Sequence, residues 1–282
     1  MTVFQLLLIA LMQGLTELFP VSSLGHAVIL PAILHWRIDQ HAPDFLPILV
    51  VLHVGTLSAL LLYFRHEWLG IARGVLRGPR EGDAENYRQL AGLLVVGTLP
   101  AVLLGFVLEK PLRHLFGEPA IAAAFLLLNG GMLLLGERLR RRPAAPAPAD
   151  AATLRGLTWQ QALSIGVWQC IAFIPGMSRS GATMVGGLRG GLNHAQAARF
   201  SFLLSAPVIA GAAVLEVPRL LRGGAHGSLP ALLLAGTVAG VAAYASTAFL
   251  MRYFRGHETA AMNPFAWYCI VAGAGALLLL WL

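Results

Sequence analysis

Residues 13–25 read QGLTELFPVSSLG, and residues 169–181 read QCIAFIPGMSRSG. Each stretch runs from a glutamine through apolar residues to a proline, and then to two hydroxyl residues and a glycine. A long apolar segment follows each of them after a short interval. The two stretches therefore indicate an internal repeat and predict a chain built from two related halves.

The composition indicates the class of protein. Hydrophobic residues make up 57% of the 282 residues, charged residues only 12%, and the mean hydropathy is +0.71. A water-soluble protein of this length needs more polar surface. Six apolar stretches are long enough to span a bilayer as helices; they cover about residues 45–64, 90–108, 119–137, 200–217, 229–251 and 264–282. The sequence therefore predicts an all-α integral membrane protein.

The arginines predict the orientation of the two halves. They gather between the first two spans and again after the third span. Cytoplasmic loops carry an excess of Lys and Arg, so these two loops are expected in the cytoplasm. The first motif then precedes a span that starts outside, and the second precedes a span that starts inside. The repeats are therefore expected to be inverted.

Each motif is expected to interrupt a helix. Shorter apolar pieces lie at about residues 1–12, 27–35 and 157–174, which is the length of re-entrant segments. Pro20 and Pro175 are natural break points, because proline cannot continue the hydrogen bonds of a helix. We therefore expect six transmembrane helices plus two re-entrant helix–loop–helix segments. The single membrane domain would contain a first inverted repeat (1–142), a flexible cytoplasmic linker (143–155) and a second repeat (156–282), with the two polar loops near the bilayer midplane.

The net charge of +7 favours contact with membrane lipids rather than nucleic acid. The arginines lie at the ends of apolar spans, where the positive-inside effect and anionic headgroups account for them. The two cysteines, Cys170 and Cys269, lie in apolar stretches. They have neither the spacing of a metal site nor that of a disulfide framework.

Arg179 is the strongest candidate for a functional residue, because an arginine at membrane depth is costly and usually marks a function or a buried ion pair. Its planar guanidinium suits phosphate oxygens. The hydroxyls of Ser178, Ser180 and Thr183, together with a helix expected to start near Ser180, complete a predicted anion site. The alternative is that Arg179 is an interfacial residue balanced by a carboxylate elsewhere.

Glu17 lies in an apolar segment, four residues after Gln13, so the two side chains share a helix face. A carboxylate and an amide oxygen can hold a hard divalent cation, with substrate phosphates completing its shell. Two alternatives remain open. Glu17 could be protonated and hydrogen-bonded across helices, or it could pair with Arg179, which would itself bring the loops together.

A third cluster contains Ser22, Ser23 and His26. Ser23 and His26 share a helix face, and histidine is the usual base beside a nucleophilic serine. Either serine could equally be a plain helix N-cap. Other polar residues carry weaker expectations: His53, Asn129 and Glu216 are assigned only hydrogen bonds to neighbouring helices, and His194 is expected at the surface.

The motifs QGLTELFPVSSLGH and PGMSRSGAT resemble those of the undecaprenyl pyrophosphate phosphatase family, also called the bacitracin-resistance family. The resemblance covers essentially the whole chain. Many members have Glu at the position of Gln13 and Thr at that of Leu24, and the first difference implies an altered metal dependence here. The resemblance implies a bacterial inner membrane location, a site that opens toward the periplasm, and hydrolysis of undecaprenyl diphosphate to the monophosphate carrier with a divalent cation, Mg²⁺ or Ca²⁺.

These residues suggest a mechanism as a hypothesis. Arg179 would clamp the phosphoryl group with Ser22, Ser178, Ser180 and Thr183, and Glu17 with Gln13 would hold the metal. In one version of the reaction Ser23 attacks phosphorus with His26 as base. In the other, a metal- or His26-activated water attacks directly. A lipid flippase or secondary transporter on the same scaffold is the alternative function, and a homodimer is left open.

Overall fold

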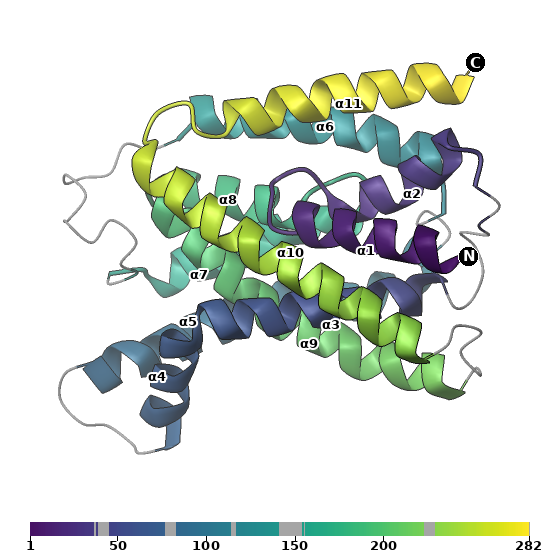
Figure 1. The fold of residues 1–282 in the computed structure, drawn as a ribbon. Helices are drawn as coiled ribbons and strands as arrows, with labels where there is room; N and C mark the ends of the chain where they lie inside the picture. Colours follow the sequence, from purple (N-terminus) through teal and green to yellow (C-terminus); the bar gives the residue numbers. More distant parts are fainter. Residues whose placement is uncertain are drawn as a thin grey trace.

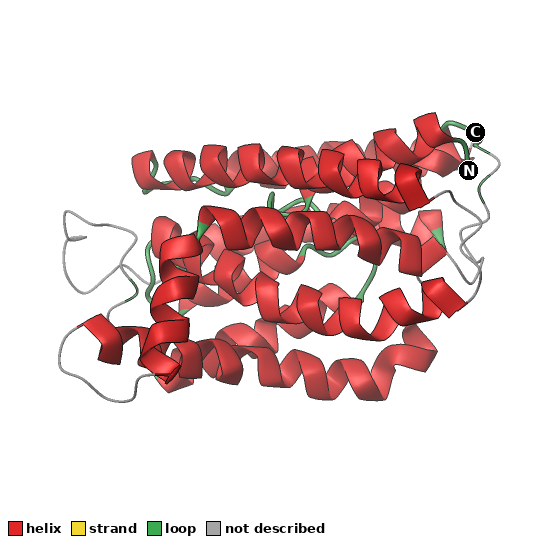
Figure 2. Cartoon of the chain, turned by 60° about the horizontal axis from the view of Figure 1, so that its bottom comes forward, coloured by secondary structure: helices red, strands yellow, loops and turns green. Residues whose placement is uncertain are grey.

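The computed structural model describes residues 1–36, 38, 45–76, 83–113, 117–140, 154, 156–222 and 229–281. Within these ranges the regular secondary structure is helical and contains no strand (Figures 1 and 2). The elements are α1 (Val3–Thr16), α2 (Ser23–Ile33), α3 (Phe45–Tyr63), α4 (Arg65–Leu76), α5 (Asp83–Arg113), α6 (Pro119–Arg138), α7 (Trp159–Gln169), the 3₁₀ helix η1 (Cys170–Phe173), α8 (Arg179–Arg189), α9 (His194–Arg222), α10 (Leu229–Gly256) and α11 (Asn263–Trp281).

Five of the described helices, α5, α6, α9, α10 and α11, are long and apolar enough to cross a membrane. A sixth candidate is the pair formed by α3 and α4, which is bent by 79° at its break. The six apolar stretches of the sequence coincide with these helices, although α5, α9 and α10 extend beyond them to 31, 29 and 28 residues. The predicted all-α class is confirmed.

Large apolar side chains cover the outer faces of these helices. Phe106 is 84% exposed, Val271 69% and Val241 68%. Moving apolar surface out of water is favourable by about 25 cal/mol per Å². Their exposure along helices of membrane-spanning length shows a multi-pass membrane protein whose outer faces meet lipid.

The helices pack in pairs that join distant parts of the sequence. α6 lies along α11, α3 packs against both α9 and α10, α1 packs on α10, and α5 on α7 (Figure 1). Glycine permits the closest of these contacts. A Cβ atom at Gly55 of α3 would overlap the carbonyl oxygen of Gly236 in α10, and one at Gly14 of α1 would overlap that of Ala239. Small residues let the backbones of membrane helices approach in this way.

Two helices are interrupted where the sequence predicts. α1 ends at Thr16 and α2 begins at Ser23, while η1 ends at Phe173 and α8 begins at Arg179. Pro20 and Pro175 lie within these breaks. Each new helix is capped in the same way: Ser22 accepts a hydrogen bond from the Gly25 amide, and Ser178 accepts one from the Gly181 amide.

The structure bears on two further predictions, the linker between the halves and the exposure of His194. The linker predicted at 143–155 lies outside the described residues, apart from residue 154. His194, expected at the surface, is buried at 1% exposure, so that prediction is wrong. Its Nε2 lies 2.8 Å from Glu137 Oε2, and Glu137 also accepts the backbone N–H groups of Ala260 and Met262. Glu137 of α6 therefore joins His194, at the start of α9, to the connection between α10 and α11.

The contact between α3 and α10 yields a prediction. Gly55→Ala is expected to destabilise the protein by about 1–3 kcal/mol, because the added methyl group must push two helix backbones apart. The midpoint of thermal unfolding in detergent should fall. Gly131→Ala in α6 is the matched control, because a Cβ there meets no atom within 4 Å. Equal midpoints for the two variants would contradict the close contact.

Candidate active site

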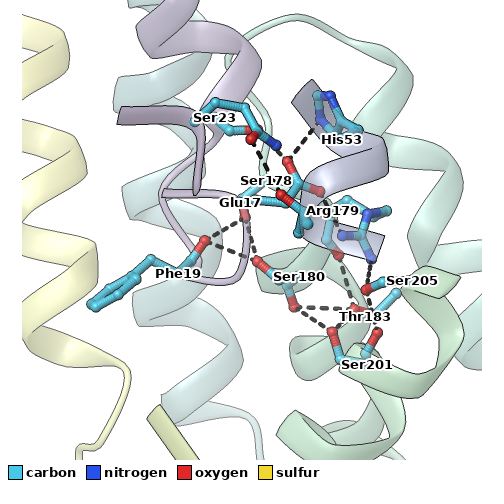
Figure 3. Close-up of polar contacts among 12 residues, drawn as sticks. Glu17, Phe19, Ser23, His53, Ser178, Arg179, Ser180, Thr183, Ser201 and Ser205 are labelled. Carbon is cyan, nitrogen blue, oxygen red and sulfur yellow. Dashed lines mark hydrogen bonds and ion pairs between the residues drawn. The ribbon is translucent and has the colours of Figure 1, made fainter. Parts of the chain in front are cut away.

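The loops that interrupt the two helix pairs meet inside the protein (Figure 3). The Phe19 carbonyl accepts a hydrogen bond from Ser180 Oγ at 2.9 Å. Asn129 of α6 bridges the loops, because its Nδ2 donates to the Pro20 carbonyl at 2.9 Å and its Oδ1 accepts from the Ser178 amide at 3.0 Å. The expected hydrogen bond of Asn129 to a neighbouring helix is thus a link between both motifs.

An ion pair joins the two halves at the centre of the site. Arg179 Nη2 lies 2.7 Å from Glu17 Oε1, and their side chains are only 13% and 7% exposed. Glu17 follows the last turn of α1, and Arg179 is the first residue of α8. Arg179 Nη1 also donates to the Ser205 hydroxyl in α9. The sequence-based alternative of a Glu17–Arg179 pair is therefore observed, and it does bring the motifs together.

Ser23 hydrogen-bonds to the same carboxylate. It is the first residue of α2, and its hydroxyl donates to Glu17 Oε2. The two side chains lie six residues apart in the chain, across the break between α1 and α2. A serine hydroxyl that donates to a carboxylate has a proton acceptor in place, which is what a nucleophilic serine needs.

His26 does not occupy the position that its spacing suggests. Its Nδ1 lies 2.7 Å from the Ser22 carbonyl, and its Nε2 lies 2.7 Å from the Tyr268 hydroxyl of α11. Within the described part of the chain His26 forms no hydrogen bond with the Ser23 hydroxyl, and Glu17 is the acceptor there instead. Tyr268 is a neighbour that spacing cannot reveal, because it comes from the last helix of the chain.

His53 of α3 also contacts Glu17, although the sequence predicts for it only a hydrogen bond to a neighbouring helix. Its Nε2 lies 3.0 Å from Glu17 Oε2, and its Nδ1 lies 2.7 Å from the Leu49 carbonyl. His53 is an ionisable residue within an apolar span, and such a residue is by default a candidate for function. Its partner Glu17 could not be identified from local sequence.

The predicted phosphate-binding hydroxyls face the protein interior. Ser22 and Ser178 cap α2 and α8. Ser180 donates to the Phe19 carbonyl, and Thr183 lies 2.6 Å from the Ser201 hydroxyl. These bonds hold the loop and helix in place, so a direct role of Ser22, Ser178, Ser180 or Thr183 in binding phosphate stays a prediction.

The donor set for a divalent cation is small. Among the described residues, no three His, Cys, Asp or Glu side chains form a metal-binding group. Gln13 Oε1 accepts from Thr56 at 3.2 Å, while the buried Gln13 Nε2 has no hydrogen-bond partner within the described part of the chain. One carboxylate, Glu17, and one amide fit a cation such as Mg²⁺, which uses one or two carboxylates and completes its shell with water and substrate phosphates.

Comparison with known proteins identifies the family of this chain. The family model for the bacitracin resistance protein BacA matches residues 6–275. The chain belongs to the BacA family. A protein from Acidiphilium cryptum named undecaprenyl-diphosphatase is 56% identical over 99% of both chains. A protein of the same name from Granulibacter bethesdensis is 52% identical over 98% of this chain and 96% of its own. Undecaprenyl-diphosphatase 2 from Chromobacterium violaceum is 47% identical over 99% of both.

The bridge made by Asn129 can be tested through stability. Asn129→Leu leaves the Pro20 carbonyl and the Ser178 amide without these partners in the interior, at a cost of about 1–3 kcal/mol for each group. Thermal unfolding in detergent should shift to a clearly lower temperature. Thr237→Val is the control, since the Thr237 hydroxyl bonds only to the Leu233 carbonyl of its own exposed helix face. A shift no larger than that of the control would rule out the bridge.

Proposed function

We propose that this chain hydrolyses undecaprenyl diphosphate to undecaprenyl phosphate and inorganic phosphate. The observation that carries the proposal is the convergence of Ser23, Glu17 and Arg179: a hydroxyl, its proton acceptor and a phosphate-binding guanidinium at one buried point. The BacA family and relatives named undecaprenyl-diphosphatase at 47–56% identity supply the substrate.

Two helix N-termini support an anionic substrate. Ser23 and Arg179 are the first residues of α2 and α8, each 11 residues long. Free backbone N–H groups and the positive end of the helix dipole favour phosphate at such positions. Arg179 has five N–H donors, and its contacts with Glu17 and Ser205 use one donor on each terminal nitrogen. Further donors can hold a phosphoryl group while Glu17 stays in place.

In the proposed reaction, Ser23 Oγ attacks the terminal phosphorus and transfers its proton to Glu17 Oε2. The bond between that phosphorus and the bridging oxygen breaks, and undecaprenyl phosphate leaves with the proton that Glu17 received. Water then cleaves the phosphoserine, releases inorganic phosphate and restores the Ser23 hydroxyl. Arg179 stabilises the charge that develops on the phosphoryl oxygens. Glu17 takes the role of base that spacing assigned to His26.

A divalent cation, Mg²⁺ or Ca²⁺, is part of the proposal. Glu17 and Gln13 would hold it, together with oxygens of the diphosphate. When bound, it would neutralise charge on the diphosphate. Gln13 contributes at most a neutral oxygen, so the cation would depend on the substrate for most of its ligands.

We also propose the finer architecture of six membrane spans plus two re-entrant segments, α1–α2 and α7–α8, in inverted repeats. The capping pattern supports it. Thr2 forms a capping box with Gln5, and Thr158 forms one with Gln161 at the same separation along the chain as Ser22 and Ser178. The contacts support it too, because α1 packs on α10 as α7 packs on α5.

The proposed location is the bacterial inner membrane, with the site facing the periplasm. The two chain termini lie at one end of the bundle and α4 lies at the other (Figures 1 and 2). The α4 end contains arginines of the described ranges, among them Arg65, Arg73 and Arg138, which favours the cytoplasm. α1 and α2 extend from the opposite end, and the polyprenyl tail would lie among the spans in lipid.

Phosphate release from undecaprenyl diphosphate by purified protein in detergent tests the function. Ser23→Ala is expected to abolish turnover. Arg179→Lys should lower kcat by roughly 10²- to 10³-fold, because a lysine keeps the charge but loses the planar fork. Arg252→Lys, on an exposed face of α10, is the matched control and should behave like wild type.

Appreciable turnover by Ser23→Ala would exclude the serine nucleophile. No release by folded wild-type protein would favour the flippase alternative, since a transporter releases no phosphate.

The role of the cation predicts a separate result. Chelation with EDTA should abolish phosphate release, and excess Mg²⁺ or Ca²⁺ should restore it. In Glu17→Gln, the added cation should fail to restore activity, because the substitution removes both the carboxylate of the donor set and the proton acceptor of Ser23. Full activity of wild-type protein in EDTA would remove the cation from the proposal and leave charge stabilisation to Arg179.

A further inference from the structure

His53 contacts the carboxylate that the proposed reaction uses as its base. Its imidazole projects from α3 toward Glu17 (Figure 3), with Nε2 3.0 Å from Oε2. The Leu49 carbonyl, 2.7 Å from Nδ1, can only accept a hydrogen bond, so Nδ1 is the donor there. Nε2 is thereby left for Glu17, and one proton lies between Nε2 and Oε2, since two bare acceptors would not approach so closely.

Two cationic or donor groups hold the Glu17 carboxylate from different sides. Arg179 Nη2 binds Oε1 at 2.7 Å, and His53 Nε2 binds Oε2. A carboxylate has about four lone-pair positions, two on each oxygen. With one position on Oε2 occupied by His53, the other is directed at the Ser23 hydroxyl.

We infer that His53 is a positioning residue of the active site, which fixes the plane of the Glu17 carboxylate so that Oε2 faces Ser23 Oγ. The inference rests on the proposed function, in which Glu17 accepts the Ser23 proton. The mechanism outlined above needs only Glu17, Ser23 and Arg179, at the ends of α1, α2 and α8, so His53 of α3 adds a residue from a fourth helix to the site. Loss of a partner that orients an active-site ligand typically costs about 10- to 100-fold in activity.

Helix packing alone does not account for this contact. Thr56, three residues after His53, already joins α3 to α1 through Gln13. His53 and Thr56 share one face of α3, just as Gln13 and Glu17 share one face of α1. The attachment of α1 to α3 therefore has a second hydrogen bond, and His53 is the one directed at the reacting carboxylate.

Two substitutions separate orientation from packing. The amide nitrogen of Gln replaces histidine Nε2, whereas that of Asn replaces Nδ1. His53→Gln should keep the bond to Glu17 and most of the wild-type kcat. His53→Asn keeps only the position near the Leu49 carbonyl, so kcat should fall about 10- to 100-fold with KM little changed. Ser58→Ala, on the same helix with a bond only to the Val54 carbonyl, is the control.

A measurement without substrate accompanies the kinetics. The infrared bands of the Glu17 carboxylate can be assigned because they disappear in the Glu17→Gln variant. We expect these bands to shift in His53→Asn but not in His53→Gln. Equal kcat values for the two His53 variants, or bands that stay unshifted in both, would overturn the inference. If wild-type protein releases no phosphate, the proposed function fails, while the infrared comparison still decides whether His53 orients Glu17.

Discussion

The ion pair between Glu17 and Arg179 is the interaction on which the arrangement of the two loops depends. It joins the end of α1 to the start of α8 in an interior where both side chains are nearly inaccessible to water. Removing one partner of a buried pair typically costs about 3–5 kcal/mol, because the other charge is left uncompensated. The pair also places Ser23 and Arg179 around one carboxylate, so the fold and the proposed chemistry depend on the same contact.

The remaining polar atoms of the loops satisfy backbone groups that a broken helix exposes. Irregular backbone is tolerated at membrane depth only where protein or a water-filled cavity covers it. Asn129 and Ser180 meet this need for the Pro20 and Phe19 carbonyls, and Ser22 and Ser178 do so for the starts of the next helices. Most of the hydroxyls in the two motifs therefore hold the loops in place, and Ser23 and Arg179 are left for the proposed reaction.

The spans and their breaks could be predicted because hydropathy and proline act locally in the chain. The site could be predicted only in part. Local spacing places Ser23 and His26 on one helix face, but Ser23 hydrogen-bonds to Glu17 from the preceding helix. His53 and Asn129 lie in apolar spans, where the sequence does not reveal which face meets the loops. His194 lies near a predicted span end, yet it is buried against Glu137 of α6 and the ring of Phe254 in α10, and these contacts depend on the tertiary structure.

The matched caps of α2 and α8 have a consequence for how the site could have evolved. Ser23 and Arg179 each directly follow a capping serine, so they occupy the same position in the two halves. If one ancestral half was duplicated, that position began as the same residue in both halves. Divergence then produced an asymmetric pair, a hydroxyl on one half and a guanidinium on the other. In the proposed reaction, one position of the repeat would thus supply the nucleophile in the first half and the anion clamp in the second.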